Sequence, residues 1–161
     1  MNLMTGVAST ELFGGEVSPA VQRLIDAARG APRIEAGAAL WTAVLSAPQS
    51  LPAYYLLYKF HASHGELDPA HEVAQKALAV AAQQASIDRD WRAVRPGDAD
   101  FATPGPARFW LFTLKALAFI SVRRGERALA LALVGKLRTL DPGDQLGFGV
   151  VEALLAQSQS G

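Results

Sequence analysis

Hydrophobic residues recur along this chain at three- and four-residue steps, which is the period of an α-helix. The first run contains Val21, Leu24, Ile25 and Ala28, and it follows Ser18-Pro19, where a capping residue precedes a proline. Glycine and proline interrupt the pattern repeatedly and mark the ends of successive helices. The pattern predicts helices over residues 18–30, 34–47, 53–64, 68–85, 106–124, 126–140 and 145–157.

Two stretches of the chain depart from this simple helical pattern. Leu129, Leu131 and Leu133 alternate with alanines, as in a β-strand, but alanine and leucine are strong helix formers and therefore favour a helix. Residues 86–105 contain two glycines, two prolines and seven charges of mixed sign. We expect this segment to be a solvated loop with a short turn around Trp91, inserted between two helix pairs.

Length and composition are those of one globular domain. The chain has 161 residues, of which 50% are hydrophobic and 19% charged. We expect a domain over residues 18–157, a flexible N-terminal segment over 1–17 and a disordered tail over 158–161. The most apolar stretch, residues 109–122, has Lys115 in its middle and is too short to span a membrane. With no secretory signal pattern in residues 1–17, the expected location is the cytoplasm.

The helix pairs repeat at a fixed distance. Ala36 and Ala43 align with Ala70 and Ala77 at an offset of 34 residues. In the second pair, Tyr54, Leu57, Gly65, Ala70 and Ala77 resemble the pattern of the tetratricopeptide repeat (TPR) family, whose period is 34 residues. The third pair matches in Leu114, Leu117, Gly125, Ala130 and the closing Leu140-Asp141-Pro142, whereas Leu137 stands where a small residue is usual.

The resemblance covers about 120 of the 161 residues and is weakest in the first pair. It implies an all-α fold in which antiparallel helical hairpins stack as a short α-solenoid, with three degenerate repeats and a C-terminal capping helix. The alternative is an irregular helical bundle, since small residues at helix crossings suit both architectures.

The resemblance also implies a binding surface. The first helix of each TPR hairpin lines a concave groove, and its groove positions carry over to Tyr55 and Lys59 in the second pair. In the third pair they carry over to Phe112, Lys115, Phe119 and Arg123. Aromatic rings interleaved with cations suit a protein or peptide partner that presents apolar and acidic groups. Phe112 and Phe119 are alternatively core residues, and Trp91 in the inserted loop is a further candidate contact.

Residue chemistry gives little support to catalysis. There are no cysteines, and no nucleophile constellation, phosphate-binding loop or dinucleotide motif is present. His61, His64 and His71 could supply three metal-binding nitrogens, but packing and helix-end roles explain them better. Asp88, Asp90, Asp98 and Asp100 are interleaved with arginines, which does not favour calcium. We therefore predict no enzyme activity, no cofactor and no bound metal.

Charge does not identify a nucleic-acid or membrane partner. Basic and acidic residues number 15 each, although residues 106–140 hold seven basic residues and one acid. These cations are dispersed over two helices and match no nucleic-acid-binding motif. The sequence thus favours a protein-binding adaptor or assembly chaperone. The alternatives are a self-associating scaffold, which would form a homodimer, and a metal- or small-molecule-binding protein that uses the histidines.

Overall fold

The computed structural model describes residues 17–160, with side chains up to Gln157. Except for Val17, the predicted N-terminal segment lies outside the described residues, as does Gly161. The described part is all-helical, and it contains seven α-helices, two 3-10 turns and no strand. The α-helices are α2 (Pro19–Ala28), α3 (Arg33–Ser46), α4 (Leu51–Ser63), α5 (Leu67–Ala85), α6 (Pro106–Arg123), α7 (Arg127–Leu140) and α8 (Gly149–Ser160), and the 3-10 turns are η1 (Trp91–Ala93) and η2 (Pro96–Asp98).

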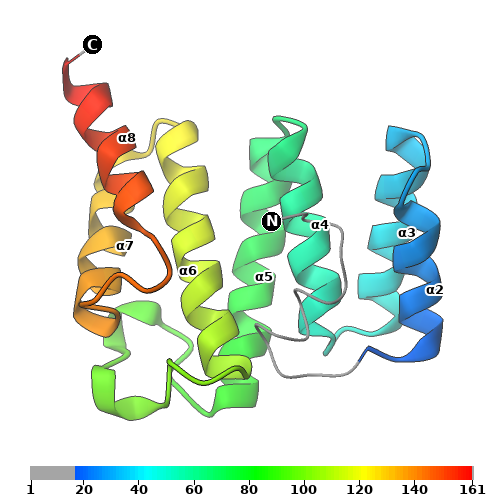
Figure 1. Cartoon of the computed structure of the whole chain (residues 1–161), viewed down its shortest axis with the longest axis horizontal. Helices are drawn as coiled ribbons and strands as arrows, with labels where there is room; N and C mark the ends of the chain where they lie inside the picture. The colour runs from blue at the N-terminus through cyan, green and yellow to red at the C-terminus, as the bar shows by residue number, and fades with distance from the viewer. Residues whose placement is uncertain (1–16, 161) are drawn as a thin grey trace.

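The helices lie side by side in chain order, from α2 and α3 at one end to α7 and α8 at the other (Figure 1). Each helix from α2 to α7 packs on the next one in the sequence. Contacts also join α4 to α6, and α8 packs on both α6 and α7. The segment 127–140 is helical, as its alanine and leucine content predicts. The all-α prediction is therefore confirmed.

Two of the helix joints are built in the same way. Gly65 and Gly125 have φ values of +71° and +79°, a left-handed conformation that glycine adopts without strain. In both joints the residue after the glycine donates its N–H to the carbonyl five positions earlier, Glu66 to His61 and Glu126 to Ser121, each at 2.9 Å. This is the Schellman motif, which ends a helix and turns the chain sharply. The hairpins α4–α5 and α6–α7 thus share one local geometry.

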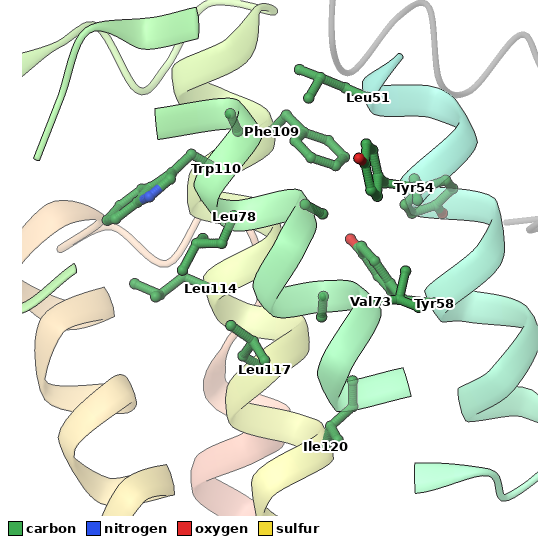
Figure 2. Packing of buried hydrophobic residues seen from close by; sticks show 14 of the residues in the cluster. Leu51, Tyr54, Tyr58, Val73, Leu78, Phe109, Trp110, Leu114, Leu117 and Ile120 are labelled. Atoms are coloured by element: carbon green, nitrogen blue, oxygen red, sulfur yellow. The ribbon is translucent and has the colours of Figure 1, made fainter. Parts of the chain in front are cut away.

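The centre of the molecule is the contact of α5 with α4 and α6. Leu78 of α5 lies near Trp110 and Leu114 of α6 (Figure 2). Ala70, Ala74, Ala77 and Ala81 of α5 are completely buried. Their small side chains let the neighbouring helices approach closely. Ala70 and Ala77, the small residues that the repeat pattern singled out, are therefore packing positions.

Helix α6 is strongly apolar because it is buried in the core of the domain. Phe109, Trp110 and Leu114 are fully buried. Within residues 17–160, no helix is both long enough and apolar enough to cross a lipid bilayer.

The last helix begins four residues later than predicted, at Gly149 and not at Gln145. Asp144 and Gly147 have φ values of +50° and +78°, which are incompatible with a continuous helix. The Asp141 carboxylate accepts hydrogen bonds from the N–H groups of residues 145 and 146, and the Asp144 carboxylate accepts from those of 148 and 149. Two aspartates thus fold residues 141–148 into turns. At its other end, α8 continues to Ser160, beyond the predicted end at Gln157.

The inserted segment 86–105 packs on the helices through a few buried apolar residues, while its charged residues are exposed. Val94 is completely buried and Phe101 is 7% exposed, with the Phe101 ring centre 5.8 Å from that of Trp110. The ammonium of Lys136, on α7, donates to the carbonyl oxygens of Arg92 and Val94 at 2.9 and 2.8 Å. Asp88, Asp90, Asp98 and Asp100 are all exposed, as the solvated-loop prediction requires.

We expect the Lys136→Met substitution to loosen this segment. Methionine keeps the apolar stem of the side chain but removes both charge-assisted hydrogen bonds. Losing them should lower the free energy of opening the segment by about 1.4 kcal/mol, which makes the opened form tenfold more populated. Limited trypsin digestion at the exposed Arg89 and Arg92 should become about tenfold faster. Lys76→Met on α5 is the matched control, because Lys76 is exposed and forms an ion pair with Glu72 on its own helix, away from the inserted segment. Equal digestion rates for the two variants would mean that Lys136 does not anchor the segment.

Candidate functional site

A pocket of about 240 Å³ lies between α4, α6 and α8, and we call it the α4–α6 pocket. Its wall is largely apolar and contains two lysines, one from α4 and one from α6. Of the seven site residues suggested by the sequence, the structure brings four together here: Lys59, Phe112, Lys115 and Phe119. The other lining residues are Tyr58, Ala62, Ala116, Ile120, Val150 and Val151.

A buried hydrogen bond fixes the two lysine-bearing helices against each other. The Tyr58 hydroxyl of α4 and the Thr113 hydroxyl of α6 lie 3.2 Å apart, and both residues are completely buried. Lys59 follows Tyr58 directly, and Lys115 lies two positions beyond Thr113. The helix packing therefore determines how the two ammonium groups approach each other. Partial burial, and then the nearby Lys115 charge, lower the pKa of Lys59 below its usual value.

Lys115 is held in place by its surroundings. Its ammonium donates to the carbonyl oxygen of Leu146 at 2.6 Å and lies 5.7 Å from the centre of the Phe112 ring. Burial lowers the pKa of Lys115, while the Asp144 carboxylate acts in the opposite direction. This lysine therefore both lines the pocket and ties the turn before α8 to α6.

Arg123 extends the same surface toward the end of α6. Its side chain is exposed, and its guanidinium lies 5.8 Å from the centre of the Phe119 ring. A cation over an aromatic face is attracted by the ring quadrupole. Arg123 thus sits beside a pocket residue without lining the pocket itself.

The site combines positive charge with apolar surface. No acidic side chain is among the described residues that line the pocket, although two lysines are. Two neighbouring ammonium groups repel each other, and an anion placed between them would relieve that repulsion. The arrangement therefore suits a ligand that carries a carboxylate or another anion next to an apolar group.

Two of the suggested residues have other positions. Tyr55 is completely buried, and its ring packs 5.6 Å from Phe112 and 5.7 Å from Tyr58. Burial raises the pKa of Tyr55 to about 12. Tyr55 therefore packs behind the pocket residues Phe112 and Tyr58 and is not accessible to a ligand. Trp91 lies in the inserted segment, stacked with Arg92 at 4.3 Å, and does not line the pocket.

Sequence reasoning missed the contribution of α8. Val150 and Val151 complete the pocket wall, and the Leu146 carbonyl holds Lys115. The only sequence signal was the apolar character of residues 150–155, which predicted a helix but not the face it covers.

The three histidines have separate roles. His61 is buried, and its Nδ1 lies 3.1 Å from the Glu66 carboxylate, whereas the Nδ1 of His64 lies 2.8 Å from the Phe60 carbonyl. Burial lowers the pKa of His71. Among the described residues, no group of three or more His, Cys, Asp or Glu side chains is arranged to hold a metal ion.

Comparison of the chain with family models, with curated proteins and with solved structures finds no match.

Proposed function

We propose that this chain is a TPR-like adaptor or assembly chaperone whose α4–α6 pocket binds an acidic and apolar segment of another protein. The proposal rests on one observation above all: two half-buried lysines share an apolar pocket in which no described residue supplies a carboxylate. A partner that supplies the carboxylate would gain binding free energy both from the charge interaction with the lysines and from the apolar contact.

The repeat interpretation is supported by the two equivalent hairpins. Gly65 and Gly125 end α4 and α6 with the same Schellman motif, and α5 and α7 begin after them with closely similar backbone angles at Glu66 and Glu126. In this interpretation α4 and α6 are successive groove-lining helices. The α2–α3 hairpin is then the first repeat, and α8 is the capping helix.

The volume of the pocket limits the size of the group that it can hold. Sites for drug-sized molecules and cofactors usually measure about 300–1,000 Å³, and this pocket is smaller. It has room for one or two side chains of a longer segment. An apolar anchor inside the pocket, with acidic groups reaching Lys59, Lys115 and the exposed Arg123, fits these dimensions best.

A selection from a random peptide library displayed on phage tests the proposal. Peptides captured by the wild-type protein should be enriched in a large apolar residue flanked by Asp or Glu. Their affinity should fall as salt is added, because the charges are only partly buried. It should also fall at high pH, since the protonated lysines bind the anion and lose their protons above their lowered pKa values. Enrichment of basic peptides, or of none, would contradict the proposal.

A further inference from the structure

Helix α3 carries an apolar stripe, and the described residues cover only part of it: Trp41 is half-buried, with its ring centre 6.0 Å from that of His61. Ile34, Ala38, Trp41 and Leu45 are spaced by four, three and four residues, so they lie along one face of the helix. Ile34 is 86% exposed and Leu45 is 76% exposed. The opposite face of α3, formed by Ala36, Leu40, Ala43 and Val44, is already buried in the core. The helix therefore has a second apolar face, which we call the α3 stripe.

A groove of about 790 Å³ runs beside the α3 stripe. Gly37, Ala38 and Trp41 of α3 line it together with Phe60 and His61 of α4. A Cβ atom on Gly37 would come within 3.1 Å of the Phe60 ring, so the space at this glycine is filled by the chain's own phenylalanine. The stripe thus presents a bulky residue, Trp41, one turn away from the small and exposed Ala38.

We propose that the α3 stripe of a second copy of this chain covers this face, with the two α3 helices antiparallel across a two-fold axis. In that register Ile34 faces the partner's Leu45, and Ala38 faces the partner's Trp41. The spacing of four, three and four residues is the same when counted from either end of the stripe, so a single two-fold axis at its middle produces all four contacts. The large tryptophan meets the small alanine, and the two-fold axis repeats this contact, as in any isologous interface.

The charges around the stripe agree with this arrangement. Between Arg33 and Ser46, the only charged residue on α3 is Glu35. In the antiparallel register the two Glu35 residues lie about 13 Å apart along the helices, beyond the Debye length of about 8 Å. The last turn of α3 contains no basic residue. The partner's Arg33, which pairs with Glu66 of its own chain at 2.8 Å, would lie beside that turn, where carbonyl groups carry partial negative charge.

The expected affinity follows from the size of the contact. One helix pair buries less than the roughly 800 Å² per partner of a standard interface. The dimer should therefore be reversible and should form at high micromolar protein concentrations. The α4–α6 pocket lies on other helices, so the two sites can be tested independently.

Sedimentation equilibrium of the full chain measures this association. The average mass of the wild-type protein should rise toward that of a dimer with concentration. The Ile34→Lys/Leu45→Lys variant should weaken association at least tenfold while its circular dichroism spectrum stays unchanged. The matched control is Leu131→Lys/Ala153→Lys, which adds the same charge at exposed apolar residues of α7 and α8 outside the α4–α6 pocket and should dimerise normally. A wild-type protein that stays monomeric, or a control that dissociates equally, would overturn the proposal.

Cysteine cross-linking tests the register, because the chain has no native cysteine. Oxidation of an equimolar mixture of the Ile34→Cys and Leu45→Cys proteins should give a disulfide-linked dimer. Each variant alone should give little, since identical positions lie about 16 Å apart in the antiparallel register and a disulfide needs Cα atoms within about 7 Å. Efficient cross-linking of either variant alone, or none in the mixture, would rule out the register.

Discussion

Replacing Trp110 with alanine should lower the free energy of unfolding by about 3–5 kcal/mol, the range observed for large aromatic residues in protein cores. Trp110 of α6 (Figure 2) is completely buried, and its ring centre lies 5.8 Å from that of Phe101 in the inserted segment. Alanine would leave a cavity where α6 meets both α5 and this segment. A urea titration followed by circular dichroism should show a much lower midpoint with an unchanged slope.

The Trp110→Phe variant is the comparison, because it keeps an aromatic ring at this position and removes less volume than alanine does. The indole N–H of Trp110 is buried and has no hydrogen-bond partner among the described residues, so phenylalanine removes an unsatisfied donor while it keeps most of the apolar contact. Its destabilisation should be less than half that of Trp110→Ala. If alanine costs less than about 1 kcal/mol, the core around Trp110 can collapse onto the cavity, and our account of its packing is wrong.

Lys59→Glu should weaken binding of a selected acidic peptide at least 100-fold, which corresponds to about 2.7 kcal/mol. The substitution places a negative charge where the proposed pocket receives the ligand's carboxylate, and like charges across an interface cost several kcal/mol. Lys59→Met removes the charge but keeps the stem, so its effect should be smaller, on the order of tenfold. Isothermal titration calorimetry with the same peptide gives all three affinities.

Lys76→Glu is the control for net charge. Lys76 lies on the exposed face of α5, outside the α4–α6 pocket, and its substitution changes the total charge by the same amount. Affinity should stay within a factor of two or three of the wild type. If Lys76→Glu and Lys59→Glu weaken binding equally, the effect comes from the overall field of the protein and not from the pocket.

The positions of the helices could be predicted because local signals mark them. Ser18-Pro19, Gly65 and Gly125 begin or end helices through capping and left-handed backbone, which depend on neighbouring residues alone. The start of α8 could not be predicted in the same way. It depends on Asp144, a residue other than glycine that adopts a positive φ while its carboxylate caps the helix.

The candidate site was predictable only in part, for a related reason. In α4, every residue from Leu51 to Tyr58 is buried, so its hydrophobic pattern has no polar face to separate groove from core. Tyr55 therefore looked like a groove residue although it is fully enclosed. The packing of α8 over the pocket is a long-range contact, and the periodicity of a single helix does not encode it.

Lys115 gives the molecule a means of linking two events. One N–H of its ammonium holds the Leu146 carbonyl, and in the proposed complex another N–H would bind the ligand's carboxylate. An ordered turn before α8 would then hold the lysine in position for the ligand, and ligand binding would in return stabilise that turn. Thermodynamic linkage makes these two effects equal in free energy. The C-terminal helix of this small domain would thus act as an allosteric effector of the pocket that it helps to enclose.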